Sequence, residues 1–249
     1  FQDINDKWVQ IAALTASASQ TESILKEVLN RYQADVPAYS LLVQRLATMI
    51  ANGGNQNAIK KLLENSVSNS SGKQIKGQGA ILEGLATGME SLKSKSPESI
   101  NNFKEDQNLL INTFFGHPSV EVRKGSLDML RVIGLNSSPE TKTAIDKSLK
   151  IMADRSLTDQ KRTEAINFLA LTDPAPYSSL LKNLIVPQEQ PIVQLAALKT
   201  LSKIPGTVVS EYVLQKWAVL TPEIRDVAIG TFLGNDERIN LLLSAIEKN

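Results

Sequence analysis

Short phrases of apolar and polar residues recur along this chain at nearly regular spacing. They read VQIAAL at 9–14, VRKGSL at 122–127, KRTEAI at 161–166, VQLAAL at 193–198 and IRDVAI at 224–229. We call the first residue of each phrase its anchor, and the last four anchors lie roughly 31 to 39 residues apart. Self-similarity at this period indicates a stack of helical repeats, in which each unit packs only on its neighbours.

The period is that of a helix-turn-helix unit of the HEAT or armadillo kind. We therefore predict an all-α fold, a right-handed α–α superhelix of about seven helix pairs that forms one domain. Proline and glycine breaks separate about fourteen helices. Range 36–116 matches the phrase poorly. The predicted repeats are 1–35, 36–68, 69–116, 117–156, 157–187, 188–220 and 221–249.

Capping residues predict where three of these helices begin. Each site combines a hydroxyl at the N-cap, a proline at the first helical position and a glutamate near the positive end of the helix dipole. The sites are Ser96-Pro97-Glu98, Ser138-Pro139-Glu140 and Thr221-Pro222-Glu223.

Two positions in each phrase predict the contact between neighbouring helices. The fourth residue after the anchor is small and the fifth is aliphatic, so a neighbouring helix can approach closely while the next side chain fills the gap. The small residues are Ala13, Ser126, Ala165, Ala197 and Ala228, and the aliphatic ones are Leu14, Leu127, Ile166, Leu198 and Ile229.

A glycine-rich tract, Gly77-Gln78-Gly79-Ala80, is followed by Gly84 and Gly88. A phosphate-binding loop would need a preceding strand and a Gly-Lys-Ser/Thr ending, and neither is present. Helical periodicity continues through the tract. We therefore expect Gly84 and Gly88 to form a flat strip for close helix contact.

The position directly after the anchor predicts a structural ladder, in which the same side chain recurs from repeat to repeat. We expect these long polar side chains to bridge to carboxylates or carbonyls of adjacent repeats. The members of this ladder are Gln10, Arg123, Arg162, Gln194 and Arg225.

Composition removes several classes of function. The 27 basic and 26 acidic residues nearly cancel, whereas nucleic-acid binding usually requires clustered cations, so we expect no nucleic-acid partner. The chain has no cysteine, which excludes disulfides, thiol nucleophiles and cysteine-ligated metals within it. No apolar run approaches the roughly 18 residues that cross a bilayer, so we expect no direct membrane insertion.

Candidate catalytic and ligand-binding residues have structural explanations. His117 is the single histidine and precedes a proline, as a turn or capping residue would. Without a second ligand of its type or a nucleophile motif beside it, we assign no catalytic, cofactor-binding or metal-binding residue. Trp8 and Trp217 border apolar stripes, and we expect both to pack in the core or cap it.

The opening stretch, DINDKWVQIAALTAS, resembles the first repeat helix of the HEAT-like segment in large bacterial membrane-bound dehydrogenases of the sugar/sorbosone type. IKGQGAILEGLATGME resembles the glycine-bearing helix of that segment. LTDQKRTEAINFLAL and PIVQLAALKTLSKI resemble its later repeats. The likeness spans essentially the whole chain, and the start at Phe1, just before a repeat helix, leads us to expect a segment of a longer protein.

This resemblance implies an N-terminal propeller, the present helical segment and a C-terminal c-type cytochrome module, exported to the periplasm or cell envelope. Haem c would then be bound elsewhere in the parent protein. The Cys-x-x-Cys-His attachment motif is absent from this chain, so the resemblance assigns it no cofactor and no enzymatic activity of its own.

We therefore expect a noncatalytic scaffold that positions catalytic and electron-transfer modules, with neighbouring domains or a protein as partner. A freestanding HEAT-repeat adaptor is the main alternative. HEAT-like DNA glycosylases, which use a basic concave face, and HEAT-like bilin lyases, which use an apolar pocket, are two further classes. On second helices, which often line one surface of a solenoid, the candidate contact residues are Lys26, Arg31, Lys60, Lys61, Lys182 and Lys216.

Overall fold

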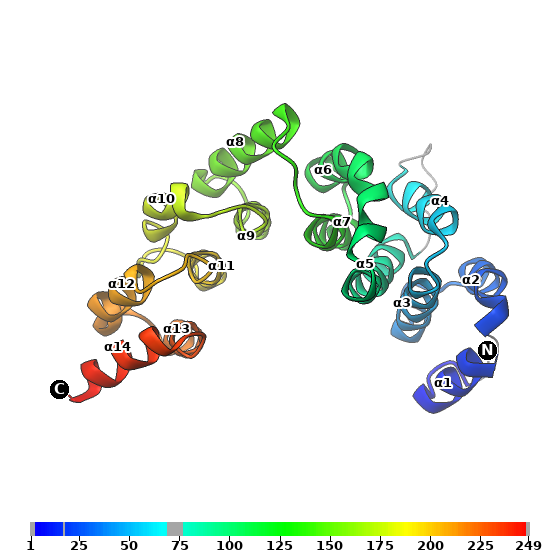
Figure 1. Cartoon of the computed structure of the whole chain (residues 1–249), viewed down its shortest axis with the longest axis horizontal. Coiled ribbons are helices and arrows are strands. Elements are labelled where there is room, and N and C mark those ends of the chain that lie inside the picture. The colour runs from blue at the N-terminus through cyan, green and yellow to red at the C-terminus, as the bar shows by residue number, and fades with distance from the viewer. Residues whose placement is uncertain (1–2, 17, 69–76, 248–249) are drawn as a thin grey trace. The chain divides into compact units, whose positions relative to one another are not determined.

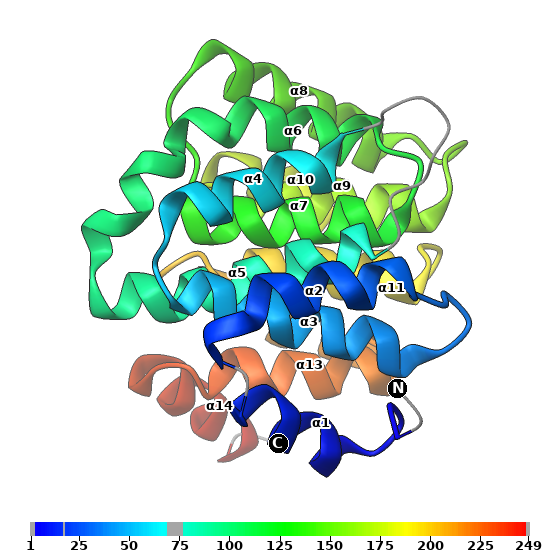
Figure 2. The same ribbon diagram turned by 90° about the vertical axis from the view of Figure 1, so that its right-hand side faces the viewer.

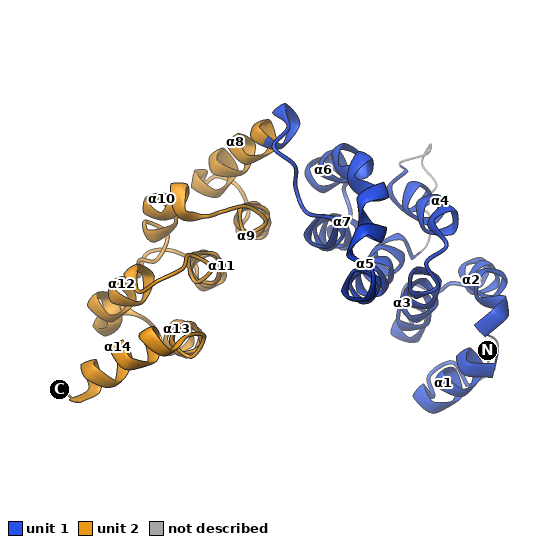
Figure 3. Cartoon of the chain, viewed as in Figure 1, with its two compact units in different colours: residues 1–141 blue, residues 142–249 orange. Residues whose placement is uncertain are grey.

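The computed structural model describes residues 3–16, 18–68 and 77–247 of the chain (Figure 1). Within these ranges the protein is all-helical, with fourteen α-helices, four 3₁₀ segments and no strand. The all-α class and the expected number of about fourteen helices are confirmed for this part. The chain divides into two compact units, residues 1–141 and 142–249 (Figure 3).

Seven α-helices and two 3₁₀ segments lie in unit 1. The α-helices are α1 (Lys7–Ala16), α2 (Thr21–Asn30), α3 (Pro37–Asn52), α4 (Gln56–Val67), α5 (Gln78–Lys95), α6 (Gln107–Gly116) and α7 (Val120–Ile133), and the 3₁₀ segments are η1 (Ala18–Gln20) and η2 (Pro97–Asp106). The predicted repeat limit at residue 69 lies outside the described residues.

The division between the units falls within α8, three residues after its start. The remaining elements are α8 (Pro139–Ala153), α9 (Asp159–Leu169), η3 (Ala175–Tyr177), α10 (Ser178–Lys182), α11 (Pro191–Leu201), α12 (Val208–Lys216), η4 (Trp217–Val219), α13 (Pro222–Phe232) and α14 (Asp236–Glu247).

A row of three helices forms the core of unit 1. Helix α3 packs against α5, and α5 packs against α7, so α5 is covered on both sides. The three helices lie side by side and run in similar directions (Figure 2). Helices α2, α4 and α6 pack on α3, α5 and α7, respectively. The side chains of Leu46, Leu82, Leu85 and Leu130 are fully buried in this core.

Glycines permit the close approach within this row. A Cβ at Gly84 would lie 2.3 Å from the carbonyl oxygen of Gln44 and 2.7 Å from Cβ of Ala47. One turn later, a Cβ at Gly88 would lie 2.5 Å from Cβ of Ala51. Real Cβ atoms do not approach neighbours this closely, so the helix-contact strip expected from the sequence is present.

The same device recurs between α5 and α7. A Cβ at Gly79 would lie 2.5 Å from Cβ of Glu121, and one at Gly125 would lie 2.5 Å from Cβ of Leu82. Helix α5 therefore presents Gly84 and Gly88 to α3 and Gly79 to α7, while α7 supplies its own Gly125 in return.

In unit 2 a second row is formed by α9, α11 and α13, each packing on the next. Its core is aliphatic and has Phe232 at one end. The small residues expected from the phrase are buried here, at Ala165, Ala197 and Ala228. This row therefore places alanine at buried helix positions, and alanine loses less backbone entropy on folding than the glycines of α5 do.

Two of the three predicted N-caps are present. The Ser138 hydroxyl accepts a hydrogen bond from the Thr141 backbone N–H at 3.1 Å, and the Thr221 hydroxyl accepts one from Ile224 at 3.5 Å. Ser96 differs, because its hydroxyl donates to the Glu98 carboxylate and the chain from Pro97 to Asp106 forms 3₁₀ helix. A helix therefore begins at Pro97 as predicted, but it is a 3₁₀ helix and the Ser96 side chain does not cap it.

Three positions expected to be buried are exposed. Ala13 and Trp8 are exposed because α1 buries only Gln10 and Leu14. The Trp8 side chain is 75% exposed, so the prediction that it packs in the core was wrong. Ile229 is 40% exposed because it lies on the side of α13 away from the row.

Replacing Gly84 with alanine is expected to lower the free energy of unfolding by about 1–3 kcal/mol, the usual cost of overpacking. The better helix propensity of alanine, worth about 1 kcal/mol, offsets only part of this cost. Urea unfolding followed by circular dichroism measures the change. Gly116→Ala is the control, because a Cβ there meets nothing within 4 Å. Equal effects of the two substitutions would contradict the role of Gly84.

Candidate functional site

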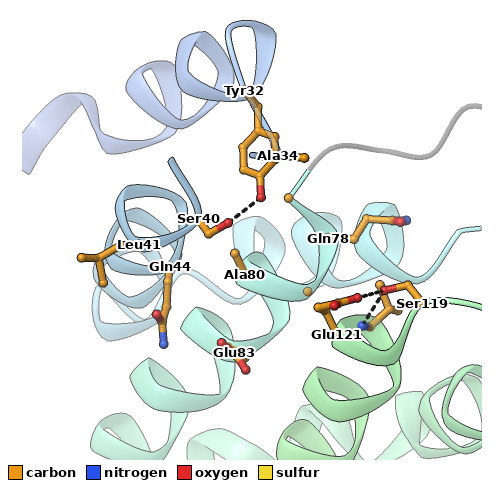
Figure 4. A pocket seen from close by; sticks show the side chains of 13 residues that line it. Tyr32, Ala34, Ser40, Leu41, Gln44, Gln78, Ala80, Glu83, Ser119 and Glu121 are labelled. Carbon is orange, nitrogen blue, oxygen red and sulfur yellow. Dashed lines mark hydrogen bonds between the residues drawn. The ribbon is translucent and has the colours of Figure 1, made fainter. Parts of the chain in front are cut away.

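A cavity with a volume of about 530 Å³ lies in unit 1, beside the start of α5. Its walls come from the turn between α2 and α3, from α3, and from the first turns of α5 and α7 (Figure 4). The lining residues are Tyr32, Ala34, Ser40, Leu41, Gln44, Gly77, Gln78, Gly79, Ala80, Glu83, Ser119, Glu121 and Val122.

The floor of the cavity is the glycine-rich tract. Gly77 adopts a left-handed conformation with φ of 76°, which glycine accommodates without strain. A Cβ there would lie 3.1 Å from the Leu29 side chain and 3.3 Å from the Tyr32 ring. Gly79 and Ala80 also belong to the lining. The missing Cβ atoms of Gly77 and Gly79 let Tyr32 and Glu121 approach the tract closely.

On the α3 side, hydroxyl and amide groups line the cavity. The Tyr32 hydroxyl and the Ser40 hydroxyl are hydrogen-bonded at 2.6 Å (Figure 4). The Tyr32 ring also packs at a tilt against Tyr39, with 6.0 Å between centroids. Gln44 presents its side-chain amide between this pair and Glu83. These groups both donate and accept hydrogen bonds, so they suit a polar ligand.

Two carboxylates line the other side. Glu121 accepts a hydrogen bond from the Ser119 hydroxyl at 2.6 Å, and this bond, with that from its own backbone N–H, lowers the pKa of Glu121 below its usual value. Glu83 forms an ion pair with Lys124, which lies outside the lining. The lining therefore offers hydrogen bonds and negative charge.

None of the residues predicted from the sequence lines this cavity. Gln10 lines a smaller, mostly apolar cavity of about 220 Å³ together with residues of α2 and α3. Tyr32, Gln44, Glu83 and Glu121 were missed, because they are far apart in sequence and belong to no recognisable motif. Only the glycine tract pointed to the place.

The residues of the predicted ladder share one type of contact. Each donates to a backbone carbonyl in the segment that precedes its own helix. Arg123 donates to Pro118 at 2.8 Å, Arg225 to Trp217 at 3.1 Å and Gln194 to Glu189 at 2.8 Å. Gln10 donates to Ile4 and accepts from Arg45, so it also ties α1 to α3. Whether these bonds stabilise the fold stays a prediction.

Arg162 is the most buried of the ladder residues. It donates to the Met152 carbonyl at 3.0 Å and to both carboxylate oxygens of Glu189, at 2.8 and 2.7 Å. Both side chains of this pair are nearly inaccessible to solvent. Arg162 holds the pKa of Glu189 below its usual value of 4.5. The pair ties α9 to the segment that leads into α11, within unit 2.

Sequence reasoning missed a second buried guanidinium. Arg238 of α14 donates to the backbone carbonyls of Ser202, Ile204, Gly206 and Thr231. It therefore joins the last helix to the turn between α11 and α12 and to the end of α13. Arg238 belongs to no phrase, so its sequence neighbourhood gave no signal.

The lysines proposed as contact positions lie on α2, α4, α10 and α12, and Arg31 directly follows the end of α2. Lys60 is paired with Glu105 and Arg31 with Glu27, while the Lys182 ammonium lies 4.9 Å from the Tyr212 ring centre. Lys26, Lys61 and Lys216 are exposed. None of these six basic residues lines the cavity.

His117 is buried at the end of α6. Its Nδ1 accepts a hydrogen bond from the Ser119 backbone N–H at 3.1 Å, and its burial lowers the pKa of the imidazole. A neutral imidazole that accepts at Nδ1 fits a turn-stabilising role. Trp217 is half-buried, with the Arg225 guanidinium 5.7 Å from its ring centre.

Comparison with family models, with curated proteins and with solved structures finds no match to this chain. Within the described ranges, no three acidic or histidine side chains gather where they could hold a metal ion. None of the described helices is long and apolar enough to span a membrane.

Glu189→Gln is expected to lower the free energy of unfolding by about 3 kcal/mol at neutral pH, because it removes the buried carboxylate that neutralises Arg162. Asp159→Asn is the control: Asp159 is 3.7 Å from Arg162 but is 44% exposed, so its loss should cost under about 1 kcal/mol. Thermal unfolding compares the two variants, and equal losses would contradict the assignment.

The same pair predicts a dependence of stability on pH. Because the pKa of Glu189 is lower in the folded state than its usual value, its contribution is complete above that usual value and is lost as the pH falls through the folded value. Between about pH 5 and about pH 3, the melting temperature of the unmodified chain should fall more steeply than that of Glu189→Gln. Parallel curves would refute this.

The ladder predicts a loss of stability on truncation. Arg225→Ala should lower the free energy of unfolding by about 1–2 kcal/mol, because the carbonyls of Trp217 and Ala218 lose a charged donor. Arg123→Ala should act similarly. If both variants keep the melting temperature of the unmodified chain, the ladder has no structural role.

Proposed function

We propose that this chain is a noncatalytic helical-repeat scaffold, a HEAT/armadillo-like right-handed superhelix of about seven helix pairs. One observation carries the proposal: the same packing row occurs in both units, as α3–α5–α7 and as α9–α11–α13. Each proposed repeat also contains two α-helices, from α1 and α2 to α13 and α14. Such stacks act by holding a surface in a fixed shape for a partner.

The cavity of unit 1 is the proposed point of contact on this scaffold. It gathers hydrogen-bonding groups from four segments that the glycine contacts hold at fixed spacing. A polar loop or side chain of a partner could hydrogen-bond to Tyr32, Gln44 and Glu121 there without any movement of the helices. Preorganised groups of this kind lower the entropic cost of binding.

The resemblance described above supplies the proposed setting. In it, this segment joins the propeller and c-type cytochrome modules of a large dehydrogenase in the periplasm or cell envelope. Substrate oxidation and haem binding would belong to those modules, and this segment would set their separation. A freestanding adaptor that binds a separate protein would use the same scaffold and cavity.

Expression of the native reading frame separates these two settings. A product much larger than 249 residues with the absorption spectrum of haem c supports the dehydrogenase setting. A haem-free product of about this length supports the adaptor instead.

In the dehydrogenase setting, a binding measurement tests whether the cavity is the point of contact with the neighbouring modules. This chain and the remainder of the reading frame are produced as separate polypeptides, and calorimetry measures their association. Gln44→Lys should weaken binding about tenfold or more, because it places a long charged side chain in the cavity. Gln215→Lys, the same change at an exposed position of α12, should have no effect. No association, or equal effects of the two variants, would refute the proposed contact.

A further inference from the structure

The turn between α3 and α4 contains the single Asn-Gly pair of the sequence, Asn52-Gly53. Asn52 is the last residue of α3 and Gly53 is its C-cap, and both residues are exposed to solvent. Asparagine is chemically labile. A following glycine increases this lability, because glycine has no side chain to hinder attack by its own backbone nitrogen on the asparagine amide.

The reaction open to this pair needs no reagent other than water. The Gly53 backbone nitrogen gives its proton to solvent and forms a bond to Cγ of Asn52, while the bond from Cγ to the side-chain nitrogen breaks and ammonia leaves. Water then opens the resulting five-membered imide ring. Opening at Cγ leaves aspartate at position 52. Opening at the main-chain carbonyl leaves isoaspartate, in which the main chain runs through the former side chain.

The structure holds the pair in an unreactive arrangement. The Gly53 N–H donates to the Met49 carbonyl at 3.0 Å, so its proton is engaged in the last turn of α3. Ring closure also requires the Asn52 backbone to leave the helical ψ of about −42°, because a helical residue keeps its Cγ beyond bonding distance of the next nitrogen. Attack can therefore occur only when this turn opens.

Gly54 secures the closed form of the turn. Its N–H donates to the Ala51 carbonyl at 3.0 Å. Its φ is 71°, a left-handed conformation that glycine adopts without strain and other residues do not. A side chain at this position would therefore favour opening of the turn while leaving the reactive pair itself unchanged.

We infer that Asn52 is a site of spontaneous deamidation in unit 1 and that the last turn of α3 controls its rate. The sequence supplies the reactive pair, and the helix end protects it. Conversion then proceeds in proportion to the fraction of molecules in which the turn is open. This inference concerns the chemical lifetime of unit 1, and it does not depend on the scaffold function.

Both products disturb the contact between α3 and α5. Aspartate places a negative charge at the negative end of the α3 dipole. Isoaspartate lengthens the main chain directly beside Ala51, whose Cβ packs against Gly88 with no room for a further atom. Asn52→Asp reproduces the first product, and it should melt about 1–4 °C below the unmodified chain.

Peptide mass spectrometry of the chain, incubated at mildly alkaline pH, measures the conversion. In the folded chain Asn52 should convert at least about tenfold more slowly than in concentrated guanidinium chloride, because the open turn is a minor population. Gly53→Ala should suppress the reaction in both conditions, because it places a Cβ beside the attacking nitrogen. The φ of −68° at Gly53 is one that alanine also adopts.

Two further glycine variants separate opening of this turn from unfolding of the whole unit. Gly54→Ala strains the turn beside Asn52 and should raise the rate in the folded chain about threefold or more. Gly134→Ala introduces the same kind of strain after α7, where φ is 81°, and should leave the rate at Asn52 unchanged. Circular dichroism checks that both variants are folded.

Three results would each overturn the inference. They are an unfolded chain that does not convert at Asn52, equal rates in the folded and unfolded chain, and a Gly134→Ala variant that converts as fast as Gly54→Ala. The first two comparisons use the unmodified chain, so they hold even if a variant fails to fold.

Discussion

The glycine contacts between α3, α5 and α7 set the spacing on which the rest of unit 1 depends. Where two helices meet at Gly84 and Ala47, no side-chain layer separates the backbones, so hydrogen bonds can form from one helix directly to the other. The Thr48 hydroxyl reaches the Gly84 carbonyl at 3.1 Å. The same closeness brings Gly79 against Glu121. The close contact between α5 and α7 therefore places both Gly79 and Glu121 in the lining of the cavity.

Unit 2 is held together differently. Helices α9, α11 and α13 have buried alanines, whereas α5 has glycines at its helix contacts. Buried guanidinium groups bond to the segments between the helices of this unit. Arg162 neutralises Glu189 and reaches the end of α8, while Arg238 bonds to four backbone carbonyls. Arginine suits both tasks because its planar group offers five donors in fixed directions. Five backbone carbonyls are thereby given charged donors.

Much of the fold could be predicted from the sequence because its signals are local. The phrases marked several of the helices, the Thr221 cap marked the start of α13, and Gly84 and Gly88 marked the contact of α5 with α3. The site could not be predicted in this way. Tyr32, Gln44, Glu83 and Glu121 come from three helices and a turn, and their proximity results from tertiary packing. Trp8 was misjudged because it borders an apolar phrase, whereas α1 buries only Gln10 and Leu14.

Ser96 shows a further limit of sequence signals. The residues there satisfy the rule for an N-cap, yet the hydroxyl donates to Glu98 and leaves the backbone N–H groups without it. A capping motif shows that a hydroxyl is able to accept a hydrogen bond from a backbone N–H at the start of a helix. Whether this bond forms depends on how the surrounding chain packs. Here η2 continues to Phe103, which is fully buried, so core packing outweighs the local preference.

The ladder residues bond to main-chain carbonyls, and this choice of acceptor has an evolutionary consequence. A carbonyl is present whatever side chain its residue carries, so the turns can change sequence freely while the donor on the following helix stays the same. The turn at His117-Pro118 and the 3₁₀ segment η4 at Trp217-Ala218 are unrelated in sequence, yet both accept hydrogen bonds from equivalent arginines. Related chains could therefore diverge almost completely between helices and still be built alike.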